Sequence, residues 1–96
     1  MDYAYQIFGN YFRDEDEFIK LSNMYRSKFT STPGVKEISM FQKVEDEIAS
    51  LLVICADKET AELVQESMKN ILETHEDDVG FHTEFVYKLL DNVKIE

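Results

Sequence analysis

The residues of this 96-residue chain that could do chemistry are its two histidines, a few amides and its five tyrosines. His75 lies in the run Glu73-Thr74-His75-Glu76-Asp77-Asp78. Such a run could bind a metal ion, and the imidazole could act as a general base or as a haem ligand. The spacing matches no defined metal motif, and the competing interpretation is an acidic, solvated helix end. We expect no metal site and keep His75 as a candidate catalytic residue.

A second histidine and the tyrosines are candidates for ligand binding. His82 could donate a proton to a substrate if it points inward beside Glu84, or it could pair with carboxylates at a subunit interface. Phenol hydroxyls can orient a flat ring through hydrogen bonds, although core and interface positions are the commoner use of tyrosine. We predict ligand contacts from His82, Tyr5 and Tyr25, and consider the same role for Tyr3, Tyr11 and Tyr87.

Two amide side chains near the amino end, Gln6 and Asn10, share one face of an expected strand because they are four residues apart. Either amide could hydrogen-bond a substrate carbonyl or an oxygen intermediate if that face lines a cavity. In the alternative interpretation, Asn10 ends the strand and Gln6 belongs to a polar pair across the sheet. We predict a catalytic role for Asn10 together with His75, and a ligand contact for Gln6.

Composition and charge exclude several classes of protein. The net charge is −10 and the ten basic residues form no cluster, so nucleic acid and anionic membranes are unsuitable partners. The longest apolar run, 51–56, is too short to span a bilayer, and the amino end lacks a signal-peptide pattern, so we expect a cytoplasmic protein. The single cysteine, Cys55, lies inside that run and is expected to fill the core. Hydrolase triads and phosphate-binding glycine loops are absent from the sequence.

Hydrophobic periodicity predicts six elements in one domain spanning residues 1–96. Strands are expected over 3–12, 35–44 and 48–56 and from residue 81, with 91–96 left as a tail. Alternation in the second strand is expected to put Val35 and Ile38 on opposite sides. One amphipathic helix starts at Asp14 and ends at 31–34, and another, which Asp57 can cap, runs to about His75. Their apolar stripes are Phe18, Leu21, Tyr25 and Phe29 in the first helix, and Ala61, Val64, Met68 and Ile71 in the second.

The order strand, helix, strand, strand, helix, strand predicts a ferredoxin-like α+β fold, β-α-β-β-α-β. In this fold two helices cover one face of a four-stranded antiparallel sheet. The third expected strand is apolar on both faces, with Leu51 and Val53 on one and Leu52 and Ile54 on the other. The open face would therefore expose a large apolar patch. We predict a homodimer that closes over this face; the alternative is a monomer with a more polar outer face.

With these elements, the chain resembles the antibiotic-biosynthesis-monooxygenase-like family of dimeric α/β barrels over residues 3–90. The resemblance rests on the order of elements and on Pro33-Gly34, which leads into the second strand. It also rests on a run that looks like the family's strand entering a helix, Leu52-Val53-Ile54-Cys55-Ala56-Asp57-Lys58-Glu59-Thr60-Ala61. The resemblance implies a dimeric α/β barrel.

The resemblance implies three hypotheses about function. The first is a cofactor-independent monooxygenase acting on a small apolar or aromatic molecule held between helices and sheet. The second is a non-catalytic ligand-binding or structural dimer, which a filled interior would favour. The third is a haem-binding enzyme, because haem-degrading members resemble one another in an Asn on the first strand, a Trp in the second helix and a His near its end. Here Asn10 lies late in its strand, tryptophan is absent, and His75 stands approximately where that histidine would be.

Overall fold

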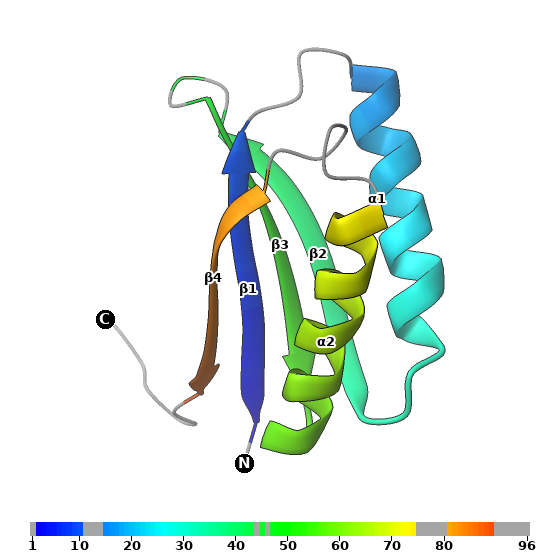
Figure 1. The fold of residues 1–96 in the computed structure, drawn as a ribbon, viewed down its shortest axis with the longest axis vertical. Helices are drawn as coiled ribbons and strands as arrows, with labels where there is room; N and C mark the ends of the chain where they lie inside the picture. Colours follow the sequence, from blue (N-terminus) through cyan, green and yellow to red (C-terminus); the bar gives the residue numbers. More distant parts are fainter. Residues whose placement is uncertain (1, 11–14, 44, 46, 75–80, 90–96) are drawn as a thin grey trace, which may run out of the picture.

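A computed structural model describes residues 2–10, 15–43, 45, 47–74 and 81–89. Its elements follow the expected order (Figure 1): β1 (Tyr3–Asn10), α1 (Glu15–Thr30), β2 (Val35–Lys43), β3 (Ile48–Cys55), α2 (Lys58–Thr74) and β4 (Phe81–Lys88). The ferredoxin-like α+β fold predicted from the sequence is confirmed.

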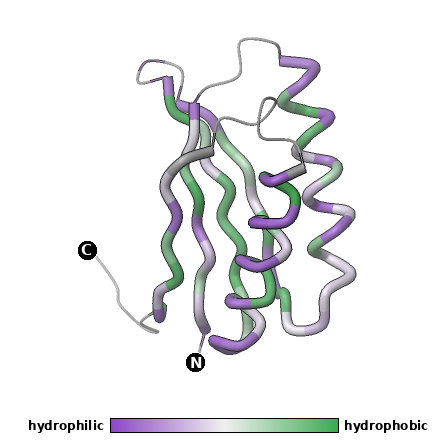
Figure 2. The backbone as a smooth tube through the Cα atoms, in the orientation of Figure 1, coloured by the Kyte–Doolittle hydropathy of each residue, from purple (hydrophilic) through white to green (hydrophobic). Residues whose placement is uncertain are grey.

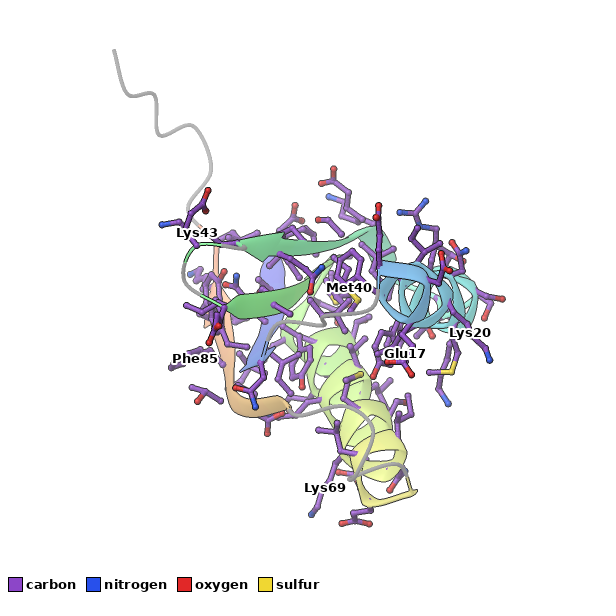
Figure 3. All side chains as sticks on the ribbon, turned by 90° about the horizontal axis from the view of Figure 1, so that it is seen from above. Glu17, Lys20, Met40, Lys43, Lys69 and Phe85 are labelled. Atoms are coloured by element: carbon purple, nitrogen blue, oxygen red, sulfur yellow. The ribbon has the colours of Figure 1, made fainter. Side chains whose placement is uncertain are left out.

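The sheet has the strand order β2-β3-β1-β4, and every pairing is antiparallel. α1 packs on β2, whereas α2 packs on β1, β3 and β4, so both helices cover the same face. β3 is almost entirely hydrophobic, whereas hydrophobic and hydrophilic residues are mixed along the other strands and the helices (Figure 2). Seen from above, Met40 points toward the helices and Phe85 points away from them (Figure 3). The sheet therefore has one covered face and one open face.

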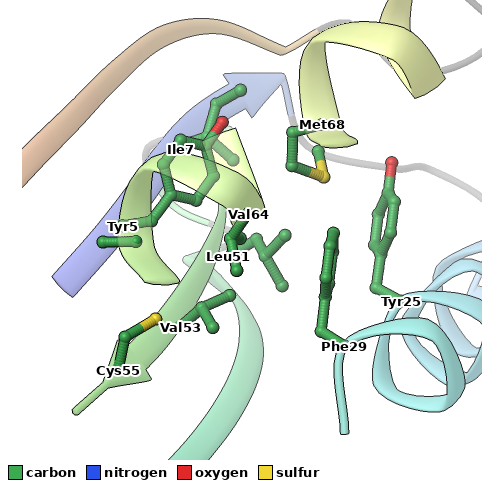
Figure 4. Close-up of a cluster of buried hydrophobic side chains, with 10 residues drawn as sticks. Tyr5, Ile7, Tyr25, Phe29, Leu51, Val53, Cys55, Val64 and Met68 are labelled. Carbon is green, nitrogen blue, oxygen red and sulfur yellow. The ribbon is translucent and has the colours of Figure 1, made fainter. Parts of the chain in front are cut away.

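The core lies between the helices and the covered face (Figure 4). Each helix contributes the apolar stripe expected from its three- and four-residue spacing. Each strand contributes alternate residues, because side chains of a strand point in turn to either face. Burial of a large apolar side chain stabilises the fold by roughly 1.5–3 kcal/mol. The buried side chains of this cluster are Tyr5, Ile7, Tyr25, Phe29, Leu51, Val53, Cys55, Ala61, Val64 and Met68.

The outer strand β2 departs from regular alternation near its start. Val35 lies opposite Cys55, and Glu37 lies opposite the residue just before that cysteine, so Lys36 is an extra residue in the pairing. The extra residue puts Val35 and Ile38 on the same side, where both pack against the core. The prediction that these two residues lie on opposite sides is wrong, because strict alternation assumes a strand without a bulge.

The other outer strand, β4, is also irregular. Thr83 pairs with Phe8, whereas Phe81 pairs with the next residue of β1, Gly9. The pairing therefore passes over His82 in β4. A bulge of this kind twists a strand and changes the direction of nearby side chains. The side chain of His82 itself lies outside the described residues.

Two loops meet at the end of the sheet where α2 begins. The Asp57 carboxylate accepts hydrogen bonds from the backbone N–H and the hydroxyl of Thr60, both at 2.8 Å. This is the helix cap expected from the sequence, and the bond from the backbone N–H holds the pKa of Asp57 below its ordinary value. The N–H of Ala56 donates to the carbonyl of Gly34 at 2.8 Å. The loop before β2 is thereby fastened to the loop before α2.

Gly34 is expected to be difficult to replace at this junction. Its φ is +93°, and a β-carbon built on it would lie 2.5 Å from the hydroxyl oxygen of Thr60. Gly34→Ala should lower the free energy of unfolding by at least about 1–2 kcal/mol, measured by urea denaturation. The same change in a Thr60→Ala background should cost less, because two of the three close atoms are then missing. Equal costs in the two backgrounds would contradict the steric part of this explanation.

Candidate functional site

The residues predicted for a site fall on opposite sides of the sheet. Gln6 and Asn10 lie on the open face, whereas Tyr5 and Tyr25 are buried in the core on the helix side. His75 lies outside the described residues, as does the side chain of His82. The candidates that the structure describes therefore form no single cluster. Their catalytic and ligand-binding roles stay predictions.

The open face of the sheet carries large apolar side chains among polar ones. Phe85 is 51% exposed and Phe41 is 47% exposed, although both are large aromatic residues. The ring of Phe8 meets that of Phe85 edge-on, with centroids 6.3 Å apart. A contiguous apolar patch of this kind marks an interaction surface. We define the apolar patch by the residues that alternate onto this face, which are Phe8, Phe41, Ile48, Leu52, Ile54, Phe85 and Tyr87.

A chain of hydrogen bonds crosses the middle of this apolar patch. The hydroxyl of Tyr87 donates to the amide oxygen of Gln6 at 2.8 Å. The amide nitrogen of Gln6 donates to the hydroxyl oxygen of Ser50 at 3.3 Å. Ser50 is fully buried although it points to the open side. We call Tyr87, Gln6 and Ser50 the polar relay. The cross-sheet polar pair considered for Gln6 is present, extended to a third strand.

On the helix side, the phenol of Tyr5 is held by an acidic residue of β4. Its hydroxyl donates to one carboxylate oxygen of Glu84 at 2.7 Å, and the amide of Gln65 donates to the other at 3.1 Å. Burial raises the pKa of Tyr5 far above its ordinary value, and the hydrogen bond to Glu84 adds to the effect. Tyr5 therefore stays protonated at neutral pH and can serve as a hydrogen-bond donor, not as a base.

The second core tyrosine, Tyr25, stacks on Phe29 of the same helix. The ring centroids are 6.3 Å apart with an angle of 18° between the planes. Burial raises the pKa of Tyr25 as well. Met68 of α2 lies beside these rings (Figure 4). The middle of the space between helices and sheet is therefore occupied by the protein's own side chains.

A surface groove of about 500 Å³ lies between α1 and β2, a volume within the range of small-molecule sites. Its charges are of both signs, and Lys36 pairs with Asp2 across 2.9 Å. The sequence carries no local signal for this groove, because it arises where a helix end meets a bulged outer strand. The residues that line it are Arg26, Thr30, Val35, Lys36, Glu37 and Ile38.

Within residues 2–10, 15–43, 45, 47–74 and 81–89, no three His, Cys, Asp or Glu side chains gather closely enough to hold a metal ion. Over the same residues, neither helix is long and apolar enough to cross a membrane.

Several solved structures superpose on this chain over nearly its whole length. SnoaB, a cofactor-independent oxygenase from Streptomyces nogalater, superposes with a TM-score of 0.73 at 8% identity, over 96% of both chains. A provisionally named antibiotic biosynthesis monooxygenase from Nitrosomonas europaea gives 0.71 at 15% identity, over 97% of this chain and 94% of its own. Rv0793 from Mycobacterium tuberculosis gives 0.70 at 9% identity, over 98% and 100%.

These similarities are structural alone. No family model matches the sequence, and no curated protein matches it. At such identities the likeness shows a shared fold and leaves the chemistry open. The chain therefore has the fold of antibiotic-biosynthesis-monooxygenase-like proteins, as its resemblance to that family led us to expect.

The buried thiol of Cys55 provides a test of the packing between the helices and the sheet. Cys55 is fully buried, and burial, with smaller contributions from Asp57 and Asp2, raises the pKa of its thiol to about 11. At pH 8 the thiolate should be at least about 100-fold scarcer than in the unfolded chain. We expect Ellman's reagent to modify the native protein at least about 100-fold more slowly than the protein in guanidinium chloride. Rapid modification of the native protein would contradict the described packing.

Proposed function

We propose that this protein is a homodimeric, cofactor-independent oxygenase of a small apolar or aromatic molecule, working in the cytoplasm. The observation that carries the proposal is the match in fold with SnoaB over 96% of both chains. An oxygenase without cofactor needs a substrate that itself supplies electrons to O₂. Its site needs hydrogen-bond donors near the developing negative charge and shelter from water.

The homodimer is supported by the open face of the sheet. Four strands of eight or nine residues form a face of roughly 500 Å² when it is projected onto a plane. The solvent-accessible area of this face is larger because side chains protrude from it, and it approaches the roughly 800 Å² that each partner buries in a standard interface. The apolar patch accounts for part of this area, and its removal from water favours association. A second copy offers the same patch and the same size, as a two-fold interface requires.

A second candidate function, a non-catalytic dimer, is favoured by the filled core. Tyr5, Tyr25, Phe29 and Met68 occupy the middle of the space between helices and sheet, each at most 1% exposed. A ligand there would have to displace them or bind near the ends of the helices. The non-catalytic dimer therefore differs from the oxygenase in predicting no protein-dependent oxygen uptake.

Haem is a poor fit to the described residues. Asn10 is exposed on the open face, on the other side of the sheet from the helices, and the chain contains no tryptophan. We propose no haem-dependent step. Titration with haem should give no shift of the Soret band at micromolar concentration.

The dimer can be tested by placing a charge on the open face. Phe85→Glu would bury unpaired carboxylates at the interface, so the dimer dissociation constant should rise at least about 100-fold by analytical ultracentrifugation. Leu63→Glu on α2 is the matched control, because Leu63 is also exposed, at 60%, but lies on the helix side. The control should sediment as the wild type does, near twice 11.3 kDa. A wild-type protein that sediments at 11.3 kDa at tens of micromolar would contradict the dimer.

The oxygenase assignment can be tested with electron-rich aromatic compounds. A panel of hydroxynaphthalenes should show protein-dependent oxygen uptake without added metal, flavin or haem, and ¹⁸O₂ should label the product. His75→Ala should lower the rate at least about 10-fold if His75 acts as predicted, whereas Asn10→Ala should do so only if the substrate binds on the open face of the sheet, where Asn10 lies. The exposed-surface variant Leu63→Ser should keep the wild-type rate. No uptake across the panel would favour the non-catalytic dimer.

A further inference from the structure

We propose that the polar relay of Tyr87, Gln6 and Ser50 is the specificity determinant of the homodimer interface, fixing how two copies align on their open faces. The inference rests on the homodimer proposed above and adds to it which residues select the arrangement. The relay runs from the outer strand β4 across β1 to β3, so it reaches from the edge of the face into its interior, where Ser50 is fully buried.

The position of Gln6 is unusual for an apolar surface. In the sheet register Gln6 lies between Leu52 on β3 and Phe85 on β4, both part of the apolar patch. An amide buried in such surroundings without hydrogen bonds would strongly oppose association. The bonds from Tyr87 and to Ser50 satisfy one acceptor and one donor of the amide within the subunit. The Gln6 amide can therefore be buried in an interface without water, because part of its hydrogen-bonding capacity is already used within the subunit.

The hydrogen-bond donors and acceptors that the relay does not use internally favour a second copy of this chain as the partner. An amide has two N–H donors and two acceptor lone pairs, and a phenol oxygen also accepts. In the hydrogen bonds between described residues, Gln6 uses one donor and one lone pair, and Tyr87 uses its donor. The relay thus offers both a donor and acceptors, which an identical relay related by a two-fold axis can match. An apolar partner would leave these groups unpaired.

A single polar group inside an apolar interface selects one arrangement among several. Flat apolar patches can slide over one another at little cost, because the hydrophobic effect has no direction. A misaligned pair of faces would bury the amide of Gln6 against Leu52 or Phe85 of the other copy without a partner. Buried polar groups are known to set register and oligomeric state in this way.

Two substitutions give opposite expectations. Tyr87→Phe keeps the ring but leaves the oxygen of Gln6 without its donor, so the dimer dissociation constant should rise at least about 10-fold. Gln6→Leu in the Tyr87→Phe background removes the amide together with the phenol hydroxyl that bonds it, so this dimer should be tighter than that of Tyr87→Phe alone but no longer uniquely aligned. Ser39→Ala, on the same face but outside the relay, should change the constant less than about two-fold.

Alignment can be measured by double electron–electron resonance with a spin label at Lys69→Cys, an exposed position on α2. Cys55 is buried and should not take the label. The wild-type background should give one narrow distance, and Gln6→Leu in the Tyr87→Phe background should give a broad or multiple distribution. Circular dichroism would show that each variant is folded, and Ser50→Ala, which removes the acceptor of Gln6, should weaken the dimer as Tyr87→Phe does.

The outcomes separate this inference from the proposed homodimer. A monomeric wild type would contradict the homodimer itself. A wild-type dimer in which Tyr87→Phe, alone and together with Gln6→Leu, tightens association would show an interface selected by apolar area alone, and would overturn the role of the relay. A wild-type dimer that neither variant changes, in affinity or in distance distribution, would also overturn it.

Discussion

The structure depends on a sheet whose strand β3 is apolar on both faces, while the two helices cover only one of them. β3 carries Leu51 and Val53 toward the helices and Leu52 and Ile54 toward the open side. The covered face closes into a core with its largest side chains fully buried. The open face carries aromatic groups that are about half exposed. This imbalance between the two faces, more than any single residue, supports the proposed homodimer.

The outer strand β4 is fastened to its neighbour on both faces. Tyr5 and Gln6 are consecutive residues of β1, so their side chains point to opposite sides of the sheet. Tyr5 donates to Glu84 on the helix side, and Gln6 accepts from Tyr87 on the open side. The strand that completes the face is thus held by polar contacts in addition to its backbone pairing. A displacement of β4 would disturb the core and the proposed interface together.

The features that could be predicted from the sequence are those set by residues close together in the chain. The helix stripe that includes Tyr25 and Phe29, the cap at Asp57 and the apolar β3 all follow from spacing within a few residues. The bulge that turns Val35 toward the core could not be predicted, because an extra residue leaves no mark in the alternation of a short strand. The polar relay could not be predicted either, since Gln6 and Ser50 meet only through a register set by the whole sheet.

The irregular pairing of the two outer strands has a consequence for how copies of this protein can meet. A long, regular outer strand exposes a row of backbone donors and acceptors that can pair with another chain and extend into aggregates. Here β2 has its extra residue at Lys36, and β4 departs from regular register beside Gly9. Each interruption shortens the stretch that a foreign strand could match. These interruptions oppose open-ended growth through the sheet edges, whereas the open face used by the proposed homodimer is no longer available once two copies have met.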